Sequence, residues 1–157
     1  DEALVQLVAA RQREGAALVK DMRGRIVRVR TAVRAIERLA PRVTERFTER
    51  LTKRFGELRE KNGVEFDPIR ILTETGVFAE RADITEELTR IRSHLDHFVA
   101  TLDKGGTVGK RVDFILQELF REITTIGNKA NSADISVHAV GVKEELEKLR
   151  EQAQNLE

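Results

Sequence analysis

Residues 108–129, VGKRVDFILQELFREITTIGNK, repeat an apolar side chain every three or four positions. The repeated residues are Val112, Ile115, Leu119, Ile123 and Ile126, and Ala130 continues the series just beyond the stretch. On a helix this spacing places the apolar side chains along one face, which must pack against a core. The stretch therefore predicts an amphipathic helix at the centre of the fold.

The remaining surface of this predicted helix carries two rows of polar side chains at the same spacing. One row is Asp113, Gln117, Arg121, Thr124, Asn128 and Asn131, and the other is Glu118, Glu122, Thr125 and Lys129. A solvated helix surface would explain both rows, but such surfaces are usually made of Lys and Glu. Because Asn and Thr are poorer helix formers, we interpret these rows as a candidate ligand-binding surface.

Helical spacing also runs through the segments on both sides of this stretch. Helices are predicted over residues 4–39 and 43–58, after Asp67-Pro68, after Asp83, and over 135–156. Pro41 separates the first two, which we expect to form a helical hairpin, and Asp83 with Glu86 fits a capping box. No segment alternates with the strand period for long enough to build a sheet. We predict an all-α fold, with a long basic helical hairpin over 1–63 followed by a compact bundle of three or four helices over 64–157.

The composition limits the cellular compartments and the kinds of catalytic or metal site that are possible. The 157 residues include no Cys, Trp or Tyr, and 35% of them are charged, which favours long helices over a sheet-based globule. Without Cys, no disulfide, thiolate metal site or thiol nucleophile forms within the chain, which fits a reducing cytoplasm. No apolar run approaches the roughly 20 residues that span a bilayer, and no signal peptide is visible. We expect a cytoplasmic protein without a membrane partner.

Positive and negative charges are separated along the chain. Residues 11–61 contain 16 Lys or Arg against 7 Asp or Glu, whereas residues 62–157 contain 12 against 18. A segment of that positive density attracts phosphate backbones through charge and counterion release. The alternative is that the basic segment packs against the acidic one.

Three blocks of sequence carry a resemblance to a known family. They are ADITEELTRIRSHLDHF at 82–98, VGKRVDFILQE at 108–118 followed by Arg121-Glu122, and KEELEKLREQAQNLE at 143–157. In this order and spacing, the chain resembles the C-terminal half of the YicC/YloC family of bacterial endoribonucleases. It departs from the family pattern at Phe120 and Thr124, where Asn is usual, and at Gly141, where an acid is usual. The resemblance implies an endoribonuclease that acts on RNA, and a preceding N-terminal domain that this chain, which begins at Asp1, lacks.

Two catalytic mechanisms are consistent with these residues. In the one we favour, Glu118 and Glu122, with Asp113 or Glu87, hold Mg²⁺ or Mn²⁺, which activates water at a phosphodiester. In the other, His94 acts as acid or base while Arg121, Arg92 and Lys129 stabilise charge on the phosphate. The candidate catalytic residues are therefore Glu118, Glu122, His94 and Arg121.

Binding partners are predicted from charge, from the resemblance and from the apolar seams. We expect RNA contacts at Arg23, Arg28, Arg30, Arg34, Arg92, Gln117 and Lys129. The lengthwise apolar seams of the first and last predicted helices indicate a homo-oligomer. The competing function is a non-catalytic RNA-binding or oligomerising module, whose cleaving residues lie in the absent N-terminal domain. No small-molecule cofactor is evident.

Overall fold

The computed structural model describes residues 2–63, 67–106 and 108–154. These residues form six helices and no strand, so the all-α prediction is confirmed. The helices are α1 (Glu2–Leu39), α2 (Pro41–Asn62), α3 (Pro68–Ala82), α4 (Thr85–Lys104), α5 (Gly109–Lys129) and α6 (Ala133–Ala153).

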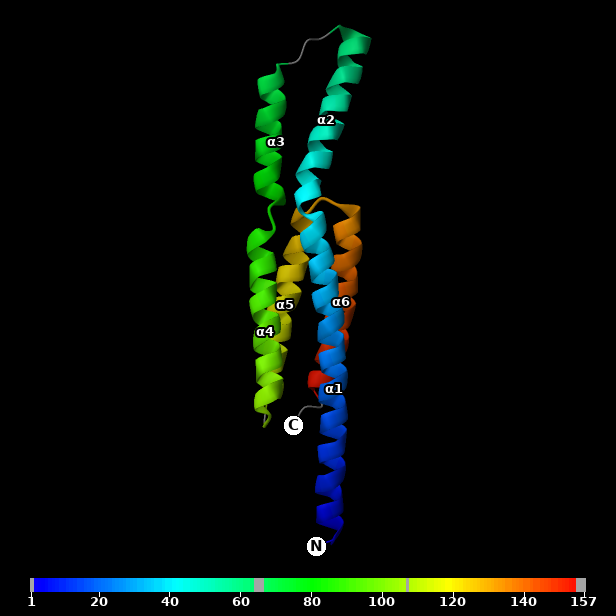
Figure 1. The fold of residues 1–157 in the computed structure, drawn as a ribbon, viewed down its shortest axis with the longest axis vertical. Helices are drawn as coiled ribbons and strands as arrows, with labels where there is room; N and C mark the ends of the chain where they lie inside the picture. The colour runs from blue at the N-terminus through cyan, green and yellow to red at the C-terminus, as the bar shows by residue number, and fades with distance from the viewer. Residues whose placement is uncertain (1, 64–66, 107, 155–157) are drawn as a thin grey trace.

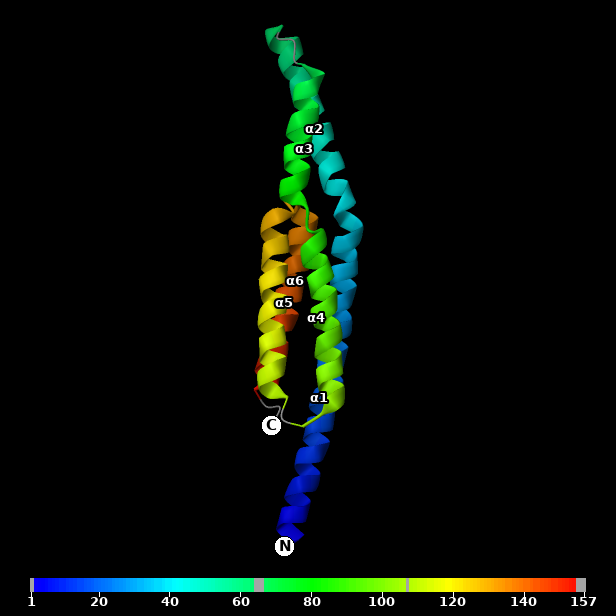
Figure 2. The same cartoon turned by 90° about the vertical axis from the view of Figure 1, so that its left-hand side faces the viewer.

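The second half of α1 packs with α4, α5 and α6 into a four-helix bundle in which neighbouring helices run in opposite directions (Figures 1 and 2). Its core contains the whole predicted stripe of α5, from Val112 to Ala130. Core residues also come from α1, where Met22 and Ile36 have no exposed surface. The core therefore draws on both sides of the expected domain boundary at residue 63.

The apolar seam of α6 is covered within the chain. Its members from Ile135 to Ala153 are buried, because α1 packs along one side of α6 and α5 along the other. Leu156, which the seam was expected to include, lies outside the described residues. The seam of α6 therefore gives no reason to expect a second chain, contrary to the sequence-based argument for an oligomer. The start of α1, in contrast, has an apolar face that this chain does not cover. Four of its residues are each more than half exposed: Leu4, Val5, Leu7 and Val8.

The helical hairpin predicted over residues 1–63 is not formed, because the chain does not turn at Pro41. Ala40 keeps a helical backbone (φ −52°, ψ −47°), and its amide donates to the Ile36 carbonyl at 2.9 Å. Proline at the start of α2 removes one helical hydrogen bond without reversing the chain. Helix α2 therefore continues from α1 with a bend, and the chain reverses after Asn62, where Gly63 is left-handed (φ 65°). The hairpin that does form has α1 and α2 on one side and α3 and α4 on the other.

Helices α2 and α3 pair with each other beyond the bundle (Figure 1), and we call this pair the arm. Its interior is thin: Val43 is the one buried residue of α2 that the structure describes, and α3 contains none. Phe47 and Phe78 stack with ring centroids 3.8 Å apart. None of the described helices is both long and apolar enough to cross a membrane.

Three polar side chains mark helix starts. Asp67 accepts a hydrogen bond from the amide two residues on, at 2.9 Å, as its position before Pro68 predicts. Ser132 caps α6, which settles whether α5 continues or a new helix begins. The predicted capping box is wrong, since Asp83 instead accepts from the amide and the hydroxyl of Thr85 at 2.9 and 2.6 Å. The hydroxyl bond, more than the amide bond, lowers the pKa of Asp83.

Candidate functional site

A strip of charged side chains runs along the seam between α4 and α5. It comprises Glu87, Arg90 and His94 from α4 and Glu118, Glu122 and Lys129 from α5, and we call it the α4–α5 strip. Each helix is held by its apolar stripe in the core, and the strip residues lie beside those stripes. The structure therefore gathers one predicted polar row of α5 against α4. Asp113, the first residue of the other row, pairs with Arg150 of α6 instead.

Two ion pairs join the helices within the strip. Lys129 donates from Nζ to Oε1 of Glu87 at 2.9 Å, and Arg90 donates from Nη1 to Oε1 of Glu122 at 3.3 Å. Both carboxylates are buried, at 6% and 4% relative exposure. A buried carboxylate is costly unless a cation and hydrogen bonds compensate it, so these pairs fix the register of α4 against α5. The hydrogen bond to Glu122 raises the pKa of Arg90, which keeps the guanidinium cationic.

His94 and Glu118 are the strip residues that remain without a partner. His94 follows Arg90 by one turn on α4, and Glu118 precedes Glu122 by one turn on α5, each on the same side of its helix as that member of the ion pair. Because the helices are antiparallel, these steps bring His94 and Glu118 to the same level. Both are half-buried, and neither makes a hydrogen bond or ion pair within the residues that the structure describes. An imidazole and a carboxylate at one level of a helix pair are the groups that general acid–base catalysis uses.

Arg121 and Arg92 lie differently with respect to this strip. Arg121 follows Glu118 by three residues, is exposed, and has no partner among the described residues. Arg92 faces α1, where its Nε lies 3.5 Å from Oε1 of Glu37. It therefore lies on the far side of α4 from His94. The two were predicted to act at one phosphate, and the structure does not bring them together.

The four predicted metal ligands are not assembled as one set. Asp113 precedes Glu118 by five residues, which turns it about 140° around α5. It accepts from Gln117 Nε2 at 2.7 Å and pairs with Arg150 Nε of α6 at 3.3 Å. The two buried carboxylates of the strip each face a cation. Within the described residues, no group of three or more His, Asp or Glu side chains is placed to hold a metal ion. The residues as arranged do not fit Mg²⁺ or Mn²⁺.

The basic half of α1 is largely paired with acids of its neighbours. Arg23 pairs with Asp103, Arg28 with Glu145 and Arg30 with Asp96. Arg34 is exposed and has no partner among the described residues. For three of the four arginines of α1 that were predicted to contact RNA, the basic segment does pack against acidic helices. An RNA role for all seven predicted residues stays a prediction, since exposed ion pairs are weak and can exchange for phosphate.

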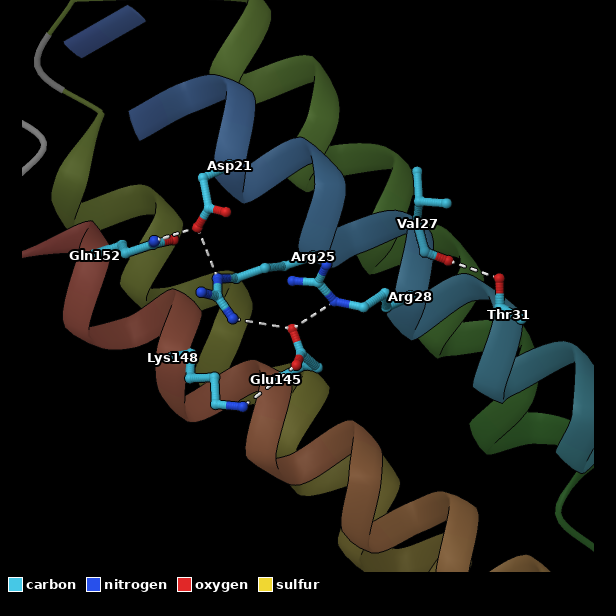
Figure 3. Close-up of polar contacts among 8 residues, drawn as sticks. All are labelled: Asp21, Arg25, Val27, Arg28, Thr31, Glu145, Lys148 and Gln152. Atoms are coloured by element: carbon cyan, nitrogen blue, oxygen red, sulfur yellow. Dashed lines mark hydrogen bonds and ion pairs between the residues drawn. The ribbon is translucent and has the colours of Figure 1, made fainter. Parts of the chain in front are cut away.

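A second polar network, between α1 and α6, was not singled out from the sequence (Figure 3). Glu145 Oε2 accepts from Arg25 at 3.2 Å and from Arg28 at 3.1 Å, and Asp21 accepts from Arg25 at 2.8 Å and from Gln152 at 2.5 Å. Hydrogen bonds from Gln152 and then Arg25 lower the pKa of Asp21. Burial is the largest single influence on Glu145 and opposes its ionisation, but the hydrogen bonds and charges of Arg28 and Arg25 together lower its pKa. Only the spacing of Asp21 and Arg25, four residues apart, signalled part of this network in the sequence.

A cleft of about 680 Å³ lies where the arm meets the bundle. Apolar side chains, including Val43, Ile84 and Leu88, line it together with Glu37 and Arg92. Oε1 of Glu37 is buried and accepts no hydrogen bond. The cleft is therefore open and mixed in polarity, and it belongs to the opposite side of α4 from the strip.

Comparison of the sequence with known proteins identifies the family of YicC-like endoribonucleases. The model described as "Endoribonuclease YicC-like, C-terminal" matches residues 36–157. A protein of Clostridioides difficile strain 630 named probable endoribonuclease YicC is 36% identical over all 157 residues, which cover 53% of that protein. A Haemophilus influenzae protein of the same name is 44% identical over 94 residues, 60% of this chain and 33% of that protein. The chain thus spans about half the length of the first relative.

Proposed function

We propose, since this chain belongs to the family of YicC-like endoribonucleases, that its α4–α5 strip takes part in cleaving RNA phosphodiester bonds. The observation that carries this proposal is the position of His94 and Glu118. They are half-buried and without a partner, in a strip whose other buried charges are compensated.

In the proposed reaction, His94 is the group that moves protons. A neutral imidazole accepts the proton of an RNA 2′-hydroxyl as that oxygen attacks the adjacent phosphorus, and the P–O5′ bond breaks. The imidazolium then returns a proton to the departing 5′ oxygen. Glu118 orients the imidazole and stabilises its charged form, because it is an uncompensated carboxylate at the same level.

Arg121 and the two ion pairs have different proposed tasks. The exposed Arg121 guanidinium, next to Glu118 on α5, can donate to the non-bridging phosphate oxygens on which charge develops. The Glu87–Lys129 and Glu122–Arg90 pairs, whose carboxylates are buried, hold the two helices at a fixed spacing. Such positioning matters because small displacements of a catalytic group lower the rate strongly.

Divalent-metal catalysis through Glu118, Glu122, Asp113 and Glu87 remains a separate prediction. For the four carboxylates to act together, Lys129 and Arg90 would have to release two of them and Asp113 would have to move around α5. Incubation of the full-length protein with labelled RNA in EDTA, and then in excess Mg²⁺ or Mn²⁺, tests this route. Full cleavage in EDTA would remove it.

The second candidate function is an RNA-binding or oligomerising module, with cleavage carried out elsewhere in a longer protein. It is favoured by one observation, namely that the chain spans about half of the Clostridioides difficile relative. Labelled RNA should be incubated with this chain, with a full-length homologue, and with His94→Gln and Glu118→Gln variants of each. We expect each variant to lose cleavage at least tenfold in the full-length background. Unchanged cleavage by both full-length variants would contradict the strip as the site and favour the module.

A further inference from the structure

An arginine recurs at every fourth position along the bent α1–α2 helix. The row is Arg30, Arg34, Arg38, Arg42, Arg46, Arg50 and Arg54. It is continuous through the bend, because Ala40 keeps a helical backbone between α1 and α2. A four-residue step advances about 6 Å along a helix and about 40° around it, so the row winds slowly as it climbs.

Ion pairs at two points of the row show which surface it crosses. Arg30 Nη2 contacts Asp96 of α4 at 2.7 Å, and Arg46 Nη1 contacts Asp134 at the start of α6 at 2.9 Å. Helices α4 and α6 flank α1 on different sides, and the core side of α1 faces between them. The row therefore passes from the α4 edge to the α6 edge across the outer face, away from the core.

The middle of the row is exposed and uncompensated. Arg34, Arg38 and Arg42 are all exposed, and none makes a hydrogen bond or ion pair within the described residues. Residues 22–44 contain seven arginines and a single acid, Glu37, which lies on the α4 side near Arg92. The next acids, Glu45 and Glu49, begin beyond the bend. Like charges four residues apart on a helix repel one another, so this arrangement lowers helix stability unless an anion is bound.

We propose that Arg34, Arg38 and Arg42 form a track that binds the phosphate backbone of RNA without reading its sequence. The inference rests on the proposed function for the identity of the polyanion. It assigns backbone binding to three unpaired arginines, two of which were not predicted from the sequence. It does not include Arg23, Arg28 and Arg30, which are already engaged with carboxylates of α4 and α6.

A polyanion fits this face better than a protein surface does. Protein interfaces have an apolar centre surrounded by polar groups. C-terminal to Val27, which is itself exposed, no large apolar side chain that the structure describes on α1 or α2 is strongly exposed. A regular series of guanidinium groups on a convex helix instead matches a ligand with regularly repeated negative charges.

The test is the salt dependence of binding to a mixed-sequence RNA carrying 2′-O-methyl groups, which cannot be cleaved by 2′-hydroxyl attack. In the full-length protein, the triple variant Arg34→Gln, Arg38→Gln, Arg42→Gln should bind at least tenfold more weakly. Its slope of log K against log salt should be shallower by about 2 to 3, the value for three lost phosphate contacts. The matched triple change to Lys, which keeps the charges, should retain the slope.

A second matched control changes the paired residues Arg23, Arg28 and Arg30 to Gln. We expect this variant to melt at a lower temperature and to keep most of the slope, because its residues contact carboxylates of α4 and α6. An unaltered slope in the Arg34, Arg38 and Arg42 variant would overturn the track, and loss of self-association in that variant with no change in slope would assign the face to protein. Because this RNA cannot be cleaved by 2′-hydroxyl attack, the result is independent of whether His94 and Glu118 catalyse cleavage.

Discussion

Nη1 of Arg90 lies 3.3 Å from Oε1 of Glu122, so a guanidinium from α4 neutralises a carboxylate of α5 that is only 4% exposed. One turn earlier on α5, Glu118 has the same side chain and lies on the same side of the helix, but no cation compensates it within the described residues. Substitution of Glu118 and substitution of Glu122 should therefore affect cleavage and stability differently.

Glu118→Gln should lower cleavage and leave stability almost unchanged. The substitution keeps side-chain size and helix propensity, and it breaks no described ion pair. A loss of at least tenfold in cleavage corresponds to about 1.4 kcal/mol of transition-state stabilisation. Cleavage rate and melting temperature should be measured on the same preparation, with Glu144→Gln on the exposed surface of α6 as the control. Wild-type cleavage by Glu118→Gln would remove this residue from the site.

Glu122→Gln should instead lower stability. The variant removes the charge that compensates Arg90, which keeps only its exposed pair with Glu86. Because the guanidinium is half exposed, we expect a loss of about 1–2 kcal/mol rather than the larger cost of a fully buried pair. Urea denaturation measures it. A variant as stable as wild type that has nonetheless lost cleavage would show that Glu122 acts in the reaction and not only in positioning.

Lys129→Met should destabilise the bundle more than the double variant Glu87→Gln, Lys129→Met. The single change leaves the Glu87 carboxylate buried without its cation, and Oε2 of that group already accepts no hydrogen bond. We expect the single change to cost about 1–3 kcal/mol in free energy of unfolding. The double variant removes the charge as well and should recover part of that loss. Equal stability of the two variants would contradict this account of the pair.

The network between α1 and α6 should make stability fall in acid. Asp21 and Glu145 both have lowered pKa values in the folded chain. Their contribution is therefore complete above the ordinary carboxylate pKa of about 4 and is lost as the pH falls through the lowered folded values. Urea denaturation between about pH 7 and pH 2 should show Asp21→Asn and Glu145→Gln less stable than wild type near neutrality, converging with it in acid. A constant difference across this range would mean that the carboxylate charges do not contribute.

Self-association, if it uses α1, should depend on its first turns. Leu4 and Val8 are 63% and 52% exposed, and they continue the apolar seam of α1 beyond the part covered by α6. Leu4→Gln with Val8→Gln should reduce the mass measured by light scattering at micromolar concentration. Leu72→Gln, at an exposed site in the arm, is the control. A monomeric wild-type chain would contradict the predicted homo-oligomer.

The sequence was informative where one periodic pattern determined the outcome. The stripe from Val112 to Ala130 is buried as its spacing predicts, because a helix that long cannot leave such a face in water. Pro41 was misleading, because a proline in the first turn is compatible with either a reversal or a bend. Only the packing of neighbouring segments decides between them.

The candidate site was partly predictable for a similar reason. Glu87, His94, Glu118 and Glu122 were all predicted, and they do lie in one strip. Their partners were not predicted, since the meeting of Arg90 with Glu122 depends on the register between two helices separated by a loop. Asp113 was grouped with Glu118 because both lie on the polar part of α5. Around the helix, however, that polar part is wide enough to face α6 on one side and α4 on the other.

The thin interior of the arm has a consequence for how the chain opens. Backbone amides in α2 and α3 are protected by a helix pair with one described buried residue, whereas those in α5 lie against a core to which that helix alone contributes six apolar residues. Hydrogen exchange in the arm should therefore proceed through partial opening at a lower free energy than exchange in the bundle. We therefore expect the chain to unfold as two cooperative units rather than one, with a calorimetric enthalpy of unfolding that differs from the van't Hoff enthalpy.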